Sequence, residues 1–383
     1  VSTMNEQIYP SAQIVLADIM FVGTLVVRDG VIAEIDTKVS ASPAAIDINK
    51  DYLIPGLIEL HTDNLEKHFT PRPKVTWPGQ PAVIAHDAQL VAAGITTVFD
   101  AIALGDVDEN SQRLANLQAM LSAIKTAQNK NLLRAEHFLH LRCELCHKDV
   151  LNIFEGLVDD SAVHLVSVMD HSPGQRQFMD MDKYRVYYQG KYGLSDQQLE
   201  EFIVRQSANS QQFSDKHRQA VVAMCQQRGI PLASHDDATY EHIEESSNFG
   251  MTIAEFPTTK IAAVESHKRG MNVLMGAPNL VRGGSHSGNI AAHELAHTGV
   301  LDILSSDYYP ASMLHAAFIL EGLDNDYDLP KAIRTVTKNP AAATKLNDRG
   351  ELAIGMRADL VQVNDDDEFP LVRQVWQQGV RVF

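Results

Sequence analysis

The sequence contains few cysteines. Cys143, Cys146 and Cys225 are the only three in 383 residues, and this odd, low count argues against the disulfide framework of small secreted domains. Cys143, Cys146 and His147 match the C-x-x-C-H pattern of haem attachment, but the chain lacks signs of export and of a small haem fold. A zinc knuckle would need a second cysteine pair. We expect Cys143 to pack outward from a strand.

Long apolar runs and an excess of basic residues are also missing. No apolar run approaches the roughly 18 residues that can span a bilayer. No Lys or Arg precedes Arg28, so the charged start of a signal peptide is absent. The 32 basic residues are outnumbered by 49 acidic ones, which gives a net charge of −17. We therefore predict a cytoplasmic protein with no nucleic-acid or membrane partner.

Both ends of the chain have the pattern of short β-strands. Asp29-Gly30 separates two β-branched runs, which is a strong hairpin signal. Near the C-terminus, Gln378-Gly379 marks a second turn after an acidic loop at residues 364–368. The expected strands are residues 13–16, 21–28, 31–35, 358–363 and 372–382. We expect residues 1–55 and 350–383 to form one small β-sandwich domain.

The middle of the chain alternates strand and helix patterns, which predicts parallel strands with helical crossovers. The eight expected strands are residues 56–60, 95–101, 136–144, 163–170, 230–234, 252–256, 272–276 and 301–305. Helical patterns fill most gaps, for example at 111–128, 217–228, 258–269 and 289–297. Eight such units predict an α/β fold with a (β/α)8 TIM-like barrel at residues 56–349. A doubly wound sheet is the alternative, but no G-x-G-x-x-G follows the first strand.

The carboxyl ends of the expected barrel strands carry polar residues. His61 and Asp63 end the first strand, and their i, i+2 spacing puts both side chains on one side of it. An imidazole and a carboxylate aimed at one point can start a metal site. The other strands end near Asp100, Glu144, Asp170-His171, His235-Asp236-Asp237, Glu255, Asn279 and Asp307. Carboxylates this close would repel one another without a cation, so we predict a metal centre at this rim.

Two segments of the expected barrel are not explained by the strand and helix pattern. Residues 172–214 form an unusually long, Tyr-rich and basic insertion, and such segments are usually functional. The sequence favours a lid and an oligomer contact about equally. Residues 283–288 form a Gly/Ser-rich loop, with Arg282 before it and His286 within it. Backbone N–H groups in such a loop can bind an anion.

The chain resembles the amidohydrolase superfamily. The likeness lies in LIPGLIELHTD, in DILSSD and in the return segment at residues 338–361. HTDNLEKHFTPRPKVTWP, HLRCEL, LVSVMDHSPGQRQF and MNVLMGAPNLVRGGSHSGN are similar to the diphosphatases of phosphonate metabolism within it. That resemblance implies hydrolysis of α-D-ribose 1-methylphosphonate 5-triphosphate to the 5-phosphate and pyrophosphate. It implies one or two divalent cations, with Zn²⁺ preferred and Mn²⁺ or Fe²⁺ as alternatives.

The same resemblance implies a set of site residues. The expected metal ligands are His61, Asp63, Glu144, His171, His235 and Asp307. Glu144, His235 and Asp307 also take catalytic roles, Asp307 as the base that accepts a proton from water. The pattern departs from the superfamily at three strands. Asp63 replaces a histidine on the first strand, and the fourth strand offers Asp170-His171 where a bridging lysine is usual. On the sixth strand, Glu255 lies near the place of a missing histidine. Metal number and the bridging ligand therefore stay open.

An anionic substrate needs local cations on an acidic chain. The candidates for binding this small phosphorylated sugar are Lys67, Arg72, Arg142, Arg176, Arg282 and His286. Arg142 is the strongest of these, because an unpaired charge inside a strand is costly, although it could instead pair with Glu144 or Asp100. We also expect a homo-oligomer. Two other functions stay open: hydrolysis of a C–N bond, as in a deaminase or deacetylase, and a non-catalytic subunit of a phosphonate-processing complex.

Overall fold

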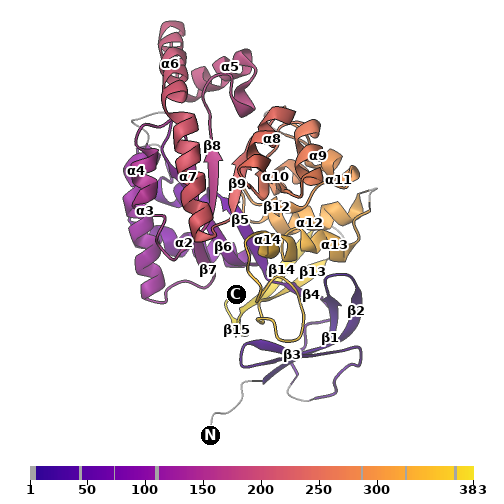
Figure 1. Cartoon of the computed structure of the whole chain (residues 1–383). Coiled ribbons are helices and arrows are strands. Elements are labelled where there is room, and N and C mark those ends of the chain that lie inside the picture. The colour runs from indigo at the N-terminus through magenta and orange to yellow at the C-terminus, as the bar shows by residue number, and fades with distance from the viewer. Residues whose placement is uncertain are drawn as a thin grey trace. The chain divides into compact units, whose positions relative to one another are not determined.

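The computed structural model describes residues 6–42, 45–72, 74–107, 112–285, 288–323, 326–365 and 369–383. Figure 1 shows its helices and strands. The strands form a seven-stranded sheet and an eight-stranded sheet. The chain divides into two compact units. Unit 1 comprises Val1–Asp100, Ser122–Phe138 and Met275–Phe383, and unit 2 comprises Ala101–Leu121 and Leu139–Leu274.

The seven-stranded sheet is built from both ends of the chain, as predicted. Its order is β15-β14-β13-β4-β1-β2-β3, so strands from the two ends meet where β13 pairs with β4. The turn at Asp29-Gly30 has positive φ at both residues and joins β2 to β3. The strands are β1 (Glu6–Val15), β2 (Met20–Arg28), β3 (Val31–Asp36), β4 (Tyr52–Pro55), β13 (Leu360–Asp365), β14 (Pro370–Gln377) and β15 (Val380–Arg381).

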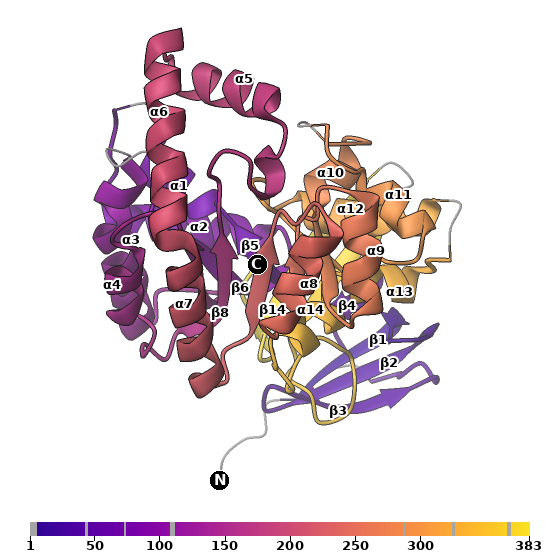
Figure 2. The ribbon, with the colours of Figure 1, turned by 45° about the horizontal axis from the view of Figure 1, so that its top comes forward.

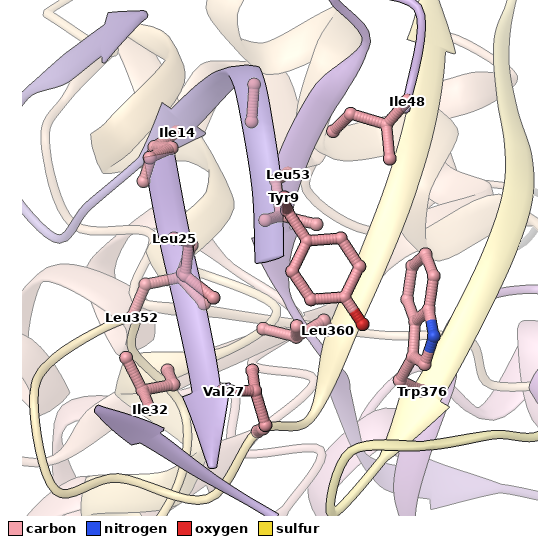
Figure 3. Close-up of a cluster of buried hydrophobic side chains, with 12 residues drawn as sticks. Tyr9, Ile14, Leu25, Val27, Ile32, Ile48, Leu53, Leu352, Leu360 and Trp376 are labelled. Carbon is pink, nitrogen blue, oxygen red and sulfur yellow. The ribbon is translucent and has the colours of Figure 1, made fainter. Parts of the chain in front are cut away.

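One face of this sheet carries a closed apolar core, shown in Figure 3. Tyr9 and Trp376 pack edge to face with ring centroids 5.1 Å apart. Leu25 and Val27 from β2 and Leu360 from β13 are fully buried in the same cluster. These side chains come from both chain ends, so the core can form only when the two ends pair.

The eight-stranded sheet is a parallel, nearly closed barrel with its strands in chain order, β5 to β12. Thr62 at the end of β5 bridges Asp307 after β12 in parallel fashion, so the first strand adjoins the last. All eight strands were predicted, two of them with the observed bounds. They are β5 (Leu57–Thr62), β6 (Ile95–Leu104), β7 (Glu136–Glu144), β8 (Val163–Met169), β9 (Leu232–His235), β10 (Ile253–Glu255), β11 (Asn272–Gly276) and β12 (Ile303–Ser305).

Gly56 connects the two sheets, because β4 ends at Pro55 and β5 begins at Leu57. A Cβ atom at Gly56 would lie 2.1 Å from Thr96 Oγ1, which is far inside contact distance. Glycine is therefore required by the close approach of the neighbouring strand. The Pro-Gly pair sets the point at which the chain enters the barrel.

Helices cover the barrel strands, and the insertion at 172–214 is largely helical. The helices are α1 (Asn64–Phe69), α2 (Gly79–Ala92), α3 (Gln112–Asn129), α4 (Val150–Glu155), α5 (Met181–Tyr192), α6 (Asp196–Asn209), α7 (Asp215–Arg228), α8 (Tyr240–Asn248), α9 (Lys260–Lys268), α10 (Ala277–Val281), α11 (Ala292–His297), α12 (Ser312–Gly322), α13 (Leu329–Arg334) and α14 (Lys338–Ala343). Two irregular turns accompany them, the 3₁₀ segment η1 (Arg176–Phe178) and the π-helical segment η2 (Ser210–Ser214).

All three cysteines are free and buried. Among the described residues, no helix combines the length and apolar character needed to cross a bilayer.

We predict that Trp376→Ala lowers the free energy of unfolding by about 3–5 kcal/mol, because it leaves a cavity beside Tyr9 in the shared core. Urea denaturation followed by circular dichroism measures the change. Val22→Ala is the matched control: Val22 is 52% exposed, so its loss should stay within about 0.5 kcal/mol. Equal midpoints for Trp376→Ala and the control would contradict the role given to this core.

Candidate metal centre

His61, Asp63 and Asp307 lie together in unit 1, with ligand atoms all within 4.8 Å of one another. Their backbones are joined directly. The Asp63 N–H donates to the Asp307 carbonyl at 2.8 Å, and the Asp307 N–H donates to the His61 carbonyl at 3.0 Å. These two hydrogen bonds hold the first and last barrel strands in a fixed register. Three predicted ligands are thus brought together by backbone pairing.

Glu59 supports this group from inside the barrel. Its side chain is fully buried, and its two oxygens accept the N–H groups of His61 and Ser306, each at 2.6 Å. Burial raises the pKa of Glu59 to about 7, against the lowering effect of these hydrogen bonds. Glu59 was not among the residues predicted from the sequence. The signal was its place two residues before His61, on the same side of a strand that is buried throughout.

Strand ends near the candidate ligands have unusual backbone angles. Asp307 has φ = 55°, Asp236 after β9 has φ = 57° and Phe256 after β10 has φ = 51°. Non-glycine residues rarely adopt this left-handed region, and such residues cluster at functional sites. The angle turns the chain sharply as it leaves each strand, so the side chain stays near the strand end.

The second group of predicted ligands lies in unit 2, where Glu144 and His171 are in direct contact. Glu144 Oε2 lies 2.5 Å from His171 Nδ1, and Glu144 Oε1 accepts a hydrogen bond from the backbone N–H of His171 at 3.0 Å. Asp236 Oδ2 is 3.6 Å from both His171 Nε2 and His235 Nε2. His171, His235 and Asp236 form a possible metal-binding group. Asp236 is an addition to the predicted set.

The electrostatics of this group favour a positive charge. Burial alone would lower the pKa of His171, but the charges of Glu144 and Asp236 and hydrogen bonds to them raise it to about 10. Burial raises the pKa of Asp236, but His235, His171 and Arg142 bring it below its usual value. The two carboxylates thus favour a positive charge at His171. A divalent cation can supply the same charge to the same atoms.

Glu255 orients His235. The Nδ1 atom of His235 lies 3.1 Å from Glu255 Oε2, and the fully buried Glu255 carboxylate also lies 3.7 Å from His140 Nε2. A carboxylate partner on one ring nitrogen raises the basicity of the other and fixes the ring. The acid that replaces the expected histidine on the sixth strand therefore supports a ligand.

Glu144 also belongs to a third buried group, with Cys146 and Asp170. The Cys146 thiol donates to Glu144 Oε1 at 3.3 Å. Asp170 Oδ1 accepts the Ser172 N–H at 3.1 Å. Burial, followed by the nearby carboxylates, raises the pKa of Cys146 well above its usual value, so the sulfur stays a neutral thiol and a proton donor.

The donor atoms fit the predicted cofactor. Imidazole nitrogens and carboxylate oxygens suit Zn²⁺, Mn²⁺ and Fe²⁺. Each unit contributes three of the six predicted ligands: His61, Asp63 and Asp307 in unit 1, and Glu144, His171 and His235 in unit 2. The grouping of all six around one centre stays a prediction.

A further histidine–carboxylate group in unit 1 is a hydrogen-bonded network. Asp100 contacts His86 Nε2 and His137 Nδ1, each at 2.7 Å. Asn64 donates to His86 Nδ1 at 3.0 Å, so the neutral His86 ring carries its proton on Nε2. His137 Nε2 lies 3.3 Å from Asp87 Oδ1. Every polar ring and carboxylate atom of this group has a partner, which favours a structural role beside the ligand segment.

The predicted substrate-binding cations have different surroundings. Lys67 is exposed and donates to the carbonyl of Tyr308, next to Asp307. Arg72 and Arg282 are exposed, and Arg142 is buried. Arg176 is buried and ion-paired with Asp237 and Glu245. His286 lies outside the described residues, so its predicted role has no structural account.

The network around His137 generates a pH prediction. Burial alone would lower the pKa of His137, but Asp100 and Asp87 raise it to about 9, above the unfolded value of about 6.5. Its stabilising contribution is therefore fully present below pH 6.5 and is lost as the pH rises through 9. We expect wild type to have a higher unfolding free energy than His137→Asn at pH 6.5. This difference should shrink by on the order of 1–3 kcal/mol as the pH rises through 9.

Urea denaturation at several pH values measures this difference. His267→Asn, at an exposed position, serves as the control and should show no such pH dependence. A constant difference between wild type and His137→Asn from pH 6 to pH 10 would mean that His137 is not charged in the fold.

Comparison with known proteins places the chain in a family. The sequence model of the amidohydrolase family matches residues 82–383. Alpha-D-ribose 1-methylphosphonate 5-triphosphate diphosphatase of Escherichia coli (strain K12) is 54% identical over 374 residues, which cover 97% of this chain and 99% of that protein. Among solved structures, 5-methylcytosine deaminase from Klebsiella pneumoniae aligns with a TM-score of 0.64 and 16% identity over 98% of each chain.

N-acetylglucosamine-6-phosphate deacetylase from Pasteurella multocida aligns with a TM-score of 0.63 and 12% identity, over 98% of this chain and 99% of that one. At this identity the solved structures establish the fold alone. The family match covers well over half of the sequence, and the E. coli relative extends over nearly all of it. The chain therefore belongs to the amidohydrolase family.

Proposed function

We propose that the chain is a metal-dependent diphosphatase of phosphonate catabolism. Its substrate is α-D-ribose 1-methylphosphonate 5-triphosphate, and its products are the 5-phosphate and pyrophosphate. The observation that carries this proposal is the 54% identity to a diphosphatase of that name over nearly the whole of both chains. The paired segments that bear His61, Asp63 and Asp307 give the reaction a chemical basis.

The cofactor is one or two divalent cations, with Zn²⁺ preferred and Mn²⁺ or Fe²⁺ as alternatives. The proposed ligands in unit 1 are His61, Asp63 and Asp307, and those in unit 2 are Glu144, His171 and His235. Asp236, within reach of both unit 2 histidines, is an additional ligand. A bound divalent cation lowers the pKa of a water molecule and offsets negative charge on phosphoryl oxygens.

Asp307 acts as the general base. Its carboxylate is close to both His61 and Asp63, and its left-handed backbone keeps it at the end of β12. Asp307 accepts a proton from the attacking water, whose oxygen forms a bond to the α-phosphorus. The bond from that phosphorus to the bridging oxygen breaks, and pyrophosphate leaves with the bridging oxygen. General-base catalysis of this kind contributes about 10²–10⁴-fold to a rate.

Local cations receive the anionic substrate on this acidic chain. Lys67 is the best placed in unit 1, because its ammonium group contacts the carbonyl of Tyr308, the residue after Asp307. Arg72, Arg282 and His286 are further candidates for the phosphates. Arg142 is buried and stays a proposed substrate-binding residue. Arg176 is also buried and already has two carboxylate partners, so we assign it a weaker part in substrate binding. Homo-oligomer formation and a cytoplasmic location stay predictions.

The two alternative functions have less support. The deaminase and deacetylase neighbours that act on C–N bonds are only 12–16% identical, whereas the diphosphatase relative is 54% identical. A non-catalytic subunit would have no need for ligand groups in both units. The relative's name and the ligand chemistry therefore favour phosphoanhydride hydrolysis.

We predict that Asp307→Asn lowers the rate of pyrophosphate release from the ribose 5-triphosphate substrate by about 10²–10⁴-fold. The amide has no basic oxygen, although it keeps the size of the carboxylate. Coupled pyrophosphate detection measures the rate, with Asp326→Asn at an exposed position as the matched control. Chelation should abolish the wild-type rate, and added Zn²⁺, Mn²⁺ or Fe²⁺ should restore it.

Equal rates for Asp307→Asn and wild type would reject the assigned base. Hydrolysis of cyclic amides by a metal-loaded protein that leaves the triphosphate intact would favour the C–N alternative. A protein inert toward both after metal addition would favour the non-catalytic subunit.

A further inference from the structure

The insertion at residues 172–214 contacts the unit 2 ligand group through one helix face. Helix α6, the π-helical segment η2 and helix α7 follow one another without a break at residues 196–228. Figures 1 and 2 show them as one long helix with α5 beside α6. Gln206, Ser210 and Ser214 occur every four residues and so share one face of this helix. Gln206 and Ser214 are buried.

The first contact from this face runs from Gln206 to Glu144. The Gln206 Nε2 atom donates to the carbonyl of Val107 at 2.8 Å, which fixes the side-chain amide. The amide oxygen then lies 3.8 Å from the Cys146 sulfur. That sulfur is 3.3 Å from Glu144 Oε1, to which the thiol donates. Gln206 therefore lies beside the thiol that donates to the Glu144 carboxylate.

The second contact runs from Ser214 and Ser210 to the turn that carries His171. The Ser214 hydroxyl donates to Ser210 Oγ, and the Ser210 hydroxyl donates to Asp170 Oδ2, each at 3.2 Å. The other oxygen of Asp170 accepts both the N–H and the hydroxyl group of Ser172. Asp170 and Ser172 flank His171. The two carboxylate oxygens of Asp170 thus tie the His171 turn to the helix.

Aromatic packing fixes the insertion at the same place. Tyr184 and Tyr188 of α5 and Phe202 of α6 form a buried cluster that includes Cys146 and Val107. The ring of Tyr188 lies 4.5 Å from that of Tyr184 and 5.3 Å from that of Phe202, measured between centroids. Opening the insertion as a lid would expose this cluster and break both contacts.

We propose that the face formed by Gln206, Ser210 and Ser214 positions Glu144 and His171 for cation binding. The insertion is therefore a fixed support of the ligand group and does not act as a lid. This inference rests on the proposed metal-dependent function. The π-helical turn fits the same role, because the extra residue per turn changes which side chains face the strand ends, and such turns are frequent at functional sites.

The test measures Zn²⁺ affinity without substrate, by competition with a chromophoric chelator. We expect Ser210→Ala and Gln206→Leu each to weaken Zn²⁺ binding by about 10–100-fold, the usual effect of removing a group that orients a metal ligand. Ser210→Thr keeps the hydroxyl and should restore the affinity. Gln211→Leu, at an exposed position in the same π-helical turn, is the matched control and should bind like wild type.

Near-ultraviolet circular dichroism confirms that each variant is folded, and Ser210→Ala removes only one half-buried hydroxyl. Wild-type affinity in both Ser210→Ala and Gln206→Leu, with a changed KM, would overturn the inference in favour of a lid. A wild-type protein that binds no Zn²⁺, Mn²⁺ or Fe²⁺ would overturn it as well. A wild-type protein that binds the cation but releases no pyrophosphate would reject the proposed function. In that case the inference would still hold if the variants lose affinity for the cation.

Discussion

Two backbone hydrogen bonds between the ends of β5 and β12 are the constraint on which the candidate site depends. They join His61 and Asp63 to Asp307, and Glu59 reinforces them by accepting N–H groups from both strands. The pairing of Glu59 with Ser306 spans 247 residues of sequence. The same hydrogen bonds that pair the first and last barrel strands therefore hold the candidate ligands of unit 1 together.

Much of the fold could be read from the sequence because its signals are local. Apolar β-branched runs predicted all eight barrel strands, and Asp29-Gly30 predicted its hairpin from the need for positive φ at both residues. His61, Asp63 and Asp307 followed from the i, i+2 rule and the resemblance of two short motifs. These three side chains lie together in unit 1, and their role as metal ligands stays a prediction.

Other features depend on contacts between distant residues, which no local pattern reveals. Asp236 becomes a candidate ligand only through its left-handed backbone and its position between His171 and His235. The role of Glu59 depends on the N–H group of Ser306, which lies 247 residues away in the sequence. Arg176 was predicted to bind phosphate, yet its guanidinium pairs with Asp237 and Glu245. The roles predicted for the basic residues stay predictions.

Both units contain buried charged groups. The chain has a net charge of −17, and each unit holds clustered carboxylates beside histidines away from water. In unit 1 the Asp100 carboxylate bridges two imidazoles, and in unit 2 His171 lies between Glu144 and Asp236. Such groups are stable only when each carboxylate has a positive or hydrogen-bonding partner. In unit 1 the hydrogen bonds of Asp100 meet that need, and at the candidate ligand groups the proposed divalent cations would meet it.

The central claim is that the paired ends of β5 and β12 hold a divalent cation. Anomalous X-ray diffraction at the zinc absorption edge, from crystals of the Zn²⁺-loaded protein, tests it most directly. We expect a peak at about 2.0–2.2 Å from His61 nitrogen and from the Asp63 and Asp307 oxygens. A fully loaded crystal with every zinc peak remote from these three side chains would contradict the account.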